Sequence, residues 1–165
     1  MNNLLSWSKR PTEVANLLNP AYFAVLINKV CDGYQSEVKE GLPYALAFIT
    51  LPIVMYPDSA EILPKTSRTR FQLWLQQNPE VLFNFAKRAK MLAPYIREGI
   101  SFGVSHNVIR LTEGGNIIPQ PLKGLKKWED APIQRTTAKQ AHLIGKIFGH
   151  VNDVPTLFAT LGVRP

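Results

Sequence analysis

Histidine and cysteine are the side chains that most often bind metals or act as bases and nucleophiles, and this chain has few of them. It contains three histidines, His106, His142 and His150, and one cysteine, Cys31. A zinc site needs three or four ligands, but no histidine has a second ligand at metal-binding spacing. No cation lies beside Cys31 to activate it, which predicts a buried, inert thiol. Known catalytic motifs are also absent, so the sequence predicts no enzyme, no metal and no cofactor.

Positively charged side chains offer a different chemistry, the binding of polyanions. The chain has 19 Lys and Arg against 12 Asp and Glu, a net charge of +7, and such an excess attracts nucleic acid or acidic protein surfaces. Lys65, Arg68 and Arg70 alternate with hydroxyl side chains where a helix is expected to begin. The backbone N–H groups of that helix end would help the cations to bind phosphate. A capped, solvated first turn is the alternative.

Other cations are candidates for the same role, although a solvated helix face also explains Lys87 and Lys90. A loop beside Trp128 is rich in lysine, and its indole ring could bind a partner, stack on a base or pack on the core. Val163 and Arg164 are candidates for partner docking, with a frayed chain end as the alternative. The predicted nucleic-acid-binding residues are Lys65, Arg68, Arg70, Lys87, Lys90, Arg110, Lys123, Lys126 and Lys127.

A run without charge extends from Leu42 to Tyr56 and contains two prolines. It is shorter than the roughly 20 apolar residues that span a bilayer, so no membrane segment is expected. Pro52 should break a continuous helix because it lacks an N–H donor and clashes with the preceding turn. The run is expected to be either the core of the fold or a permanent subunit interface.

The N-terminal segment has no basic region ahead of an apolar stretch, so it does not resemble a signal peptide. A lone cysteine cannot form an internal disulfide. Both observations predict a cytoplasmic protein.

Helix caps, prolines and apolar periodicity predict a series of helices. Asn19 and Asn78 each precede a proline, as at the start of a helix, and Asp153 is a further cap. Pro94 should force a kink or a new start, and Gly162 should end the last helix. The predicted helices are 12–18 (capped by Thr12), 20–36, 59–63, 66–77 (capped by Thr66 or Ser67), 79–93, 95–105, 137–148 and 153–161.

The apolar pattern changes to that of strands at 108–112 and 116–119, with Gly114 and Gly115 between them. This predicts a β-hairpin. Helices followed by a hairpin predict a mainly α, winged-helix-like (α+β) single domain over 1–165. Its parts would be a helical core (11–105), a hairpin wing (108–119), a basic loop (120–136) and C-terminal helices (137–165).

The order of several short motifs resembles one family over nearly the whole chain. That family is the middle component of bacterial three-component ABC-ATPase systems, which have SMC-like large subunits and relatives among Lamassu-like systems. They are associated with defence against phage and plasmids. The matching motifs are Glu13 with Ala15-Asn16-Leu17-Leu18-Asn19-Pro20, Leu42-Pro43, Leu51-Pro52-Ile53-Val54, Leu63-Pro64, Trp74-Leu75 and Leu161-Gly162-Val163-Arg164-Pro165.

The resemblance implies a non-catalytic adaptor subunit that links an SMC-like ATPase to an effector, typically a nuclease or another toxic enzyme. It brings no catalytic residues with it. The resemblance decides neither whether the subunit contacts double-stranded DNA nor whether it forms a homodimer. The alternative function is a free-standing winged-helix transcription regulator that binds DNA as a homodimer, with affinity that falls steeply as salt rises.

Overall fold

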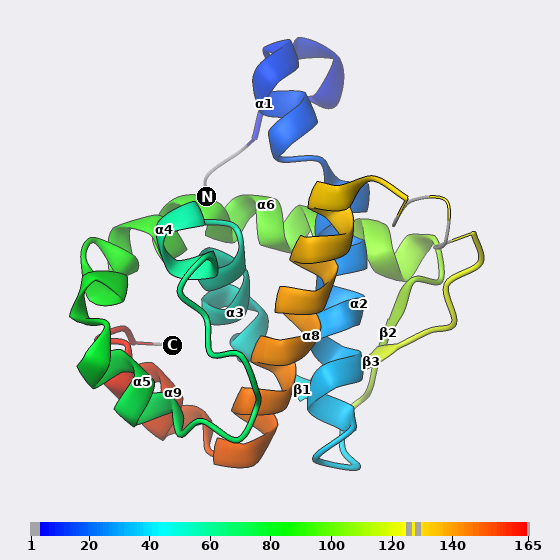
Figure 1. The fold of residues 1–165 in the computed structure, drawn as a ribbon. Helices are drawn as coiled ribbons and strands as arrows, with labels where there is room; N and C mark the ends of the chain where they lie inside the picture. Colours follow the sequence, from blue (N-terminus) through cyan, green and yellow to red (C-terminus); the bar gives the residue numbers. More distant parts are fainter. Residues whose placement is uncertain (1–3, 125–126, 128–129, 165) are drawn as a thin grey trace.

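Figure 1 shows the fold of the chain, a computed structural model that describes residues 4–124, 127 and 130–164. It is mainly helical with one small antiparallel sheet, which confirms the predicted fold class. The finer assignment to a winged helix stays a prediction. The helices, with 3-10 turns labelled η, are η1 (Trp7–Lys9), α1 (Thr12–Leu17), α2 (Pro20–Gln35), η2 (Tyr44–Leu46), α3 (Ala47–Val54), α4 (Pro57–Ala60), α5 (Phe71–Gln77), η3 (Pro79–Leu82), α6 (Phe85–Ser105), α8 (Pro132–Val151) and α9 (Val154–Thr160), and the strands are β1 (Leu42–Pro43), β2 (Ile109–Leu111) and β3 (Asn116–Pro119).

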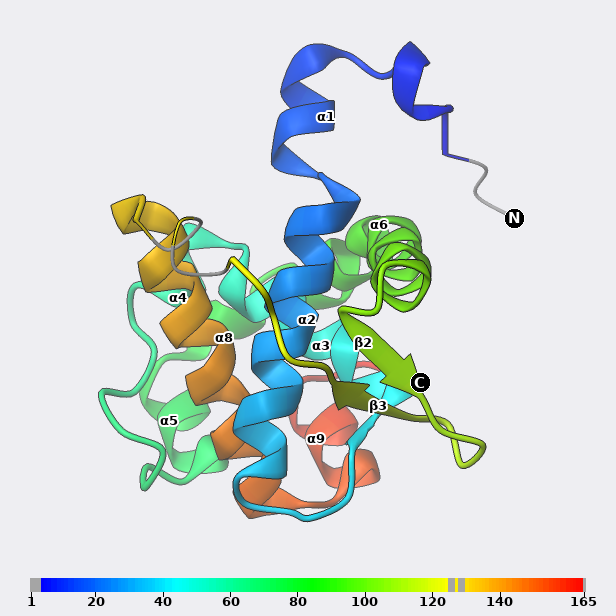
Figure 2. The same ribbon diagram turned by 90° about the vertical axis from the view of Figure 1, so that its right-hand side faces the viewer.

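Helix α2 runs through the middle of the molecule and packs against α8 and α6 (Figures 1 and 2). It begins where the sequence predicts, because the Asn19 side chain accepts a hydrogen bond from the Ala21 N–H at 2.8 Å. Its length and composition, taken together with α1, would also allow a membrane span. In this fold, however, α2 contributes several fully buried residues to the core, including Phe23, Leu26 and Ile27.

Glycines let the three long helices approach closely. A methyl group added at Gly33 would overlap the backbone oxygen of His142, and one added at Gly145 would overlap that of Val30. The backbones of α2 and α8 are therefore in direct contact. On the α6 side, a methyl group at Gly99 would lie 2.6 Å from Cβ of Phe23.

Most of the uncharged run lies in the core, although Tyr44 and Tyr56 are exposed. Leu46, Leu51 and Ile53 are completely buried. The expectation that Pro52 breaks the helix is wrong, because α3 continues through it to Val54. Proline removes one hydrogen-bond donor from the helix, and the burial of the apolar residues around it offsets that loss.

Further helix boundaries differ from their predictions, and the expected helix 59–63 is α4, Pro57–Ala60. The expected helix 79–93 is a 3-10 turn followed by α6, because Asn84 has a φ of 54°, a left-handed conformation that interrupts a right-handed helix. Pro94 starts no new helix, since α6 runs unbroken through it. At the N-terminal end, Thr12 does not cap α1; Pro11 occupies the N-cap position.

Helix α8 begins at Pro132, five residues before the predicted start, so the basic loop is shorter than expected. Proline is favoured at the first helical position because its missing N–H would be unpaired there in any case. The C-terminal prediction is confirmed: α9 ends at Thr160, and Gly162 follows with a φ of 68°.

The predicted hairpin is confirmed as β2 and β3, which pair in an antiparallel register with Arg110 opposite Ile118. Strand β1 adds to the other edge of β3, giving the order β1-β3-β2. The buried Asn28 of α2 fastens the hairpin by donating hydrogen bonds to the carbonyl oxygens of Val108 at 2.7 Å and Gln120 at 2.9 Å.

The N-terminal arm, η1 and α1, projects from the body of the molecule (Figures 1 and 2). One side chain attaches it to α6: Arg10 makes two hydrogen bonds to the Glu98 carboxylate, at 2.8 and 2.7 Å. The Arg10 guanidinium also lies over the rings of Trp7 and Tyr95. Paired hydrogen bonds of this kind fix orientation as well as distance.

Candidate functional site

The three cations predicted to bind phosphate, Lys65, Arg68 and Arg70, are all exposed, and of the three only Arg70 lies at a helix end, as the N-cap residue of α5. The predicted helix start at Thr66 or Ser67 is wrong, because α5 begins at Phe71. Residues 65–70, here called the basic loop segment, form a loop between α4 and α5. Lys65 and Arg68 therefore lack the help that backbone N–H groups of a helix terminus were expected to give.

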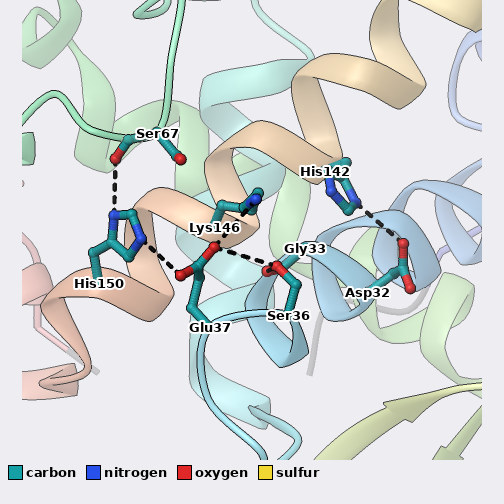
Figure 3. Close-up of polar contacts among 8 residues, drawn as sticks. All are labelled: Asp32, Gly33, Ser36, Glu37, Ser67, His142, Lys146 and His150. Atoms are coloured by element: carbon teal, nitrogen blue, oxygen red, sulfur yellow. Dashed lines mark hydrogen bonds and ion pairs between the residues drawn. The ribbon is translucent and has the colours of Figure 1, made fainter.

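A cluster of polar side chains holds the basic loop segment against the body of the protein (Figure 3). The His150 ring lies between two acceptors, with Nδ1 2.8 Å from the Ser67 carbonyl oxygen and Nε2 2.8 Å from a Glu37 carboxylate oxygen. Lys146, one turn earlier on α8, lies 3.2 Å from the other Glu37 oxygen. Through its two ring nitrogens, His150 thus joins Ser67 of the basic loop segment to Glu37.

The same contacts act on the Glu37 carboxylate. Hydrogen bonds from Lys146 and then His150 lower the pKa of Glu37 below its ordinary value of 4.5, because both partners stabilise the ionised form. A carboxyl group whose pKa is lower in the folded than in the unfolded protein stabilises the fold at pH values above its ordinary pKa. That stabilisation is lost as the pH falls through the lowered value.

Replacing Glu37 with glutamine is expected to loosen the basic loop segment at neutral pH. The amide cannot form the ion pairs, so trypsin should cleave after Lys65, Arg68 and Arg70 several-fold faster than in the wild type. Limited proteolysis at pH 7 measures this rate. The melting temperatures of the wild type and the variant should converge as the pH falls below 4.5 and through the lowered pKa of Glu37.

The exposed Glu61 provides the matched control for this experiment. Glu61→Gln should leave both the cleavage rate and the melting profile as they are in the wild type. Equal cleavage rates for wild type and Glu37→Gln would contradict a restraining role of the cluster.

The remaining candidates for acid–base or metal chemistry have structural contacts. His142 Nδ1 lies 3.1 Å from a carboxylate oxygen of Asp32, across the α2–α8 contact (Figure 3). His106 stacks on Phe102. Burial raises the pKa of the Cys31 thiol, as expected for an inert cysteine. Within residues 4–124, 127 and 130–164, no three His, Cys, Asp or Glu side chains gather as a metal site would require.

The structure brings three predicted residues together at one groove: Lys90, Val163 and Arg164. The groove has a volume of about 560 Å³ and lies between α3, α6 and the segment that follows α9. Its walls are mainly apolar. The residues that line it are Tyr44, Ala45, Phe48, Ile49, Ala86, Ala89, Lys90, Ala93, Arg97, Phe158, Gly162, Val163 and Arg164.

Aromatic residues build one wall of this groove. The rings of Tyr44 and Phe48 lie 5.2 Å apart, centroid to centroid. The Arg97 guanidinium lies over the Phe48 ring at 5.4 Å, which holds its charge at the groove. The residues that α6 contributes to the lining are the small Ala86, Ala89 and Ala93 and the two cations Lys90 and Arg97.

The other predicted cations do not line the groove. They lie on α6, on β2 and between β3 and α8, and each is exposed. Lys126 and Trp128 lie outside the described residues, so the structure leaves their predicted roles untested. The exposed cations in question are Lys87, Arg110, Lys123 and Lys127.

A comparison with protein families matches residues 7–165 to the family described as MC3, ABC-three component (ABC-3C) system Middle Component 3. The chain belongs to this family. The match covers nearly all of the middle component, including every element that builds the groove, and it confirms the resemblance seen in the sequence motifs. Neither the curated proteins nor the solved structures contain a significant match to it.

Sequence reasoning missed the aromatic wall of this middle component and Arg97. A signal for the α6 side was present, because Ala86, Ala89, Ala93 and Arg97 recur at helical spacing on one stripe. Small apolar residues on a helix usually pack inward, so such a stripe does not by itself distinguish a groove from a buried face. Tyr44 and Phe48 lie in the uncharged run, where nothing in the sequence separates groove residues from core residues.

Proposed function

We propose that this middle component is a non-catalytic adaptor, which links an SMC-like ATPase to an effector subunit in a cytoplasmic complex of prokaryotic defence against phage and plasmids. Family membership supports the part of the proposal that involves several components. It also favours the adaptor over a free-standing transcription regulator, because a middle component works with other subunits.

The observation that carries the adaptor proposal is the groove between α3, α6 and the C-terminal segment. It combines an apolar lining with cations from two separate elements, Arg97 of α6 and Arg164 of the C-terminal segment. Ligand and peptide sites in proteins are concave and mostly apolar, with a few placed polar groups. A groove of this composition suits the binding of another protein.

Co-expression with the ATPase and the effector of its own system tests the adaptor proposal. The three chains should co-migrate on size-exclusion chromatography. Omission of the middle component should separate the ATPase from the effector. If those two associate equally well without it, the linking role is excluded.

Contact with DNA is a second candidate function, supported by the exposed cations of the basic loop segment and the net charge of +7. Replacing Lys65, Arg68 and Arg70 with alanine should weaken duplex binding about tenfold or more at low salt, since contacts with phosphate dominate such affinity. The melting temperature should stay nearly unchanged because all three side chains are exposed. Fluorescence anisotropy with a labelled duplex gives the affinity at several salt concentrations.

A matched control for the charge removed is the triple variant Lys9→Ala, Lys39→Ala, Lys139→Ala, which alters three exposed lysines elsewhere. If both triple variants bind the duplex equally, the basic loop segment has no special role. A large loss of melting temperature with unaltered DNA binding would make its cations structural.

A further inference from the structure

The three cations at the groove share one feature: no carboxylate of the described chain pairs with Lys90, Arg97 or Arg164. All three are exposed, whereas the less exposed Arg10 is paired with Glu98. Like charges around a concave surface of low polarity focus a positive potential into it. The groove is therefore suited to a group that carries negative charge.

The lining decides which kind of anion fits. Ala86, Ala89 and Ala93 leave room along α6 for a bulky side chain, and Tyr44 and Phe48 offer it an apolar wall. An apolar side chain that enters the groove is removed from water, and this transfer is favourable by about 25 cal/mol per Å² of apolar surface buried. The phosphate backbone of a nucleic acid has no such group to insert. The lining thus favours a protein segment over DNA.

We infer that this groove binds an acidic amphipathic segment of a partner subunit, an inference that rests on the proposed adaptor function. An apolar side chain of the segment fills the space beside Ala89, and its Asp or Glu carboxylates pair with the three cations. Recognition of an amphipathic segment by an apolar groove is a recurring mode of binding between proteins. Burial of the apolar side chain beside Ala89 contributes affinity, while the cations select an acidic partner.

A second copy of this chain carries a net charge of +7, so a positive groove repels it on balance. Its exposed apolar segment near the N-terminus, around Leu5 and Trp7, carries Lys9 and has no acidic residue between Leu4 and Arg10. That segment would bring positive charge to a positive groove.

The test measures the affinity of the purified middle component for the purified ATPase and for the purified effector of its system, by biolayer interferometry at low and high salt. The double variant Lys90→Glu, Arg97→Glu should weaken binding to one of the two subunits at least tenfold, and most strongly at low salt. Ala89→Trp should weaken the same interaction at both salt concentrations by filling the groove. Lys87→Glu, on the same helix but outside the groove, should bind within twofold of the wild type.

A photo-crosslinking amino acid at position 86, an exposed residue of the lining, identifies the occupant without altering the charges and leaves the space beside Ala89 free. A crosslink to a partner peptide rich in Asp or Glu supports the inference. A crosslink to a second copy, to a basic peptide or to added duplex DNA overturns it, as does unchanged affinity of variants that melt like the wild type. If the wild type binds neither subunit, the adaptor function fails and this inference fails with it. If the wild type binds a subunit and the groove variants bind it equally well, only this inference fails.

Discussion

Replacing Gly145 with alanine is expected to lower the melting temperature by roughly 5–10 °C, given that an extra methyl group in a packed core typically costs about 1–3 kcal/mol or more and that 1 kcal/mol shifts a domain of this size by about 2–4 °C. The added methyl group would overlap the Val30 backbone oxygen. Backbone cannot rotate aside as a flexible side chain can, so α2 and α8 would have to separate. Circular dichroism melts of the two proteins measure the difference.

The direction of this prediction is opposite to that expected from helix propensity, because alanine is favoured over glycine in a helix by about 1 kcal/mol. Gly114→Ala is the control, since a methyl group there meets no atom closer than 3.8 Å. That variant should melt within about 2 °C of the wild type, corresponding to less than about 1 kcal/mol. A Gly145→Ala variant more stable than the wild type would show that the helices are not in contact at this point.

Replacing Ile53 with aspartate is expected to abolish folding. Ile53 is completely buried in the middle of the uncharged run, and an ionised carboxylate there loses its hydration without gaining a partner, a loss of several kcal/mol. Domains of this kind are stable by only about 5–15 kcal/mol. Size-exclusion chromatography and circular dichroism should find aggregated or unfolded protein.

The conservative variant Ile53→Val separates loss of packing from introduction of charge. It should remain folded and lose about 0.5–1.5 kcal/mol, measured by urea denaturation. A soluble, cooperatively folded Ile53→Asp variant that failed only to bind its partners would instead place the run at a subunit interface.

Local signals predicted the elements that they cap or terminate. Asn19 before Pro20 predicted the start of α2, because an asparagine side chain accepts a hydrogen bond from the first free N–H groups of a helix. Gly162 predicted the end of α9, because glycine readily adopts the left-handed conformation that ends a helix. The hairpin was predicted for the same reason. Strand β1 could not be, since two residues with a proline have no strand pattern and owe their conformation to β3.

The errors arose where packing overrides local preference. Pro52 and Pro94 lie inside helices that are held by burial on several sides, as the buried Ile53 and Ile96 show. The same limit applies to the candidate site. Lys90 and Arg164 were singled out separately, for different roles, and only the tertiary fold joins them with Phe48 in one groove.

The glycine contacts of α2 have a mechanical consequence. Where the backbones of α2 and α8 touch at Gly33 and Gly145, no layer of side chains lies between them that could shear or change rotamer. Helix α6, which carries one wall of the groove, is pressed against α2 through Gly99. We therefore expect the three helices to move as one rigid unit. Arg10 joins the N-terminal arm to α6, so the arm and the groove are attached to the same helix.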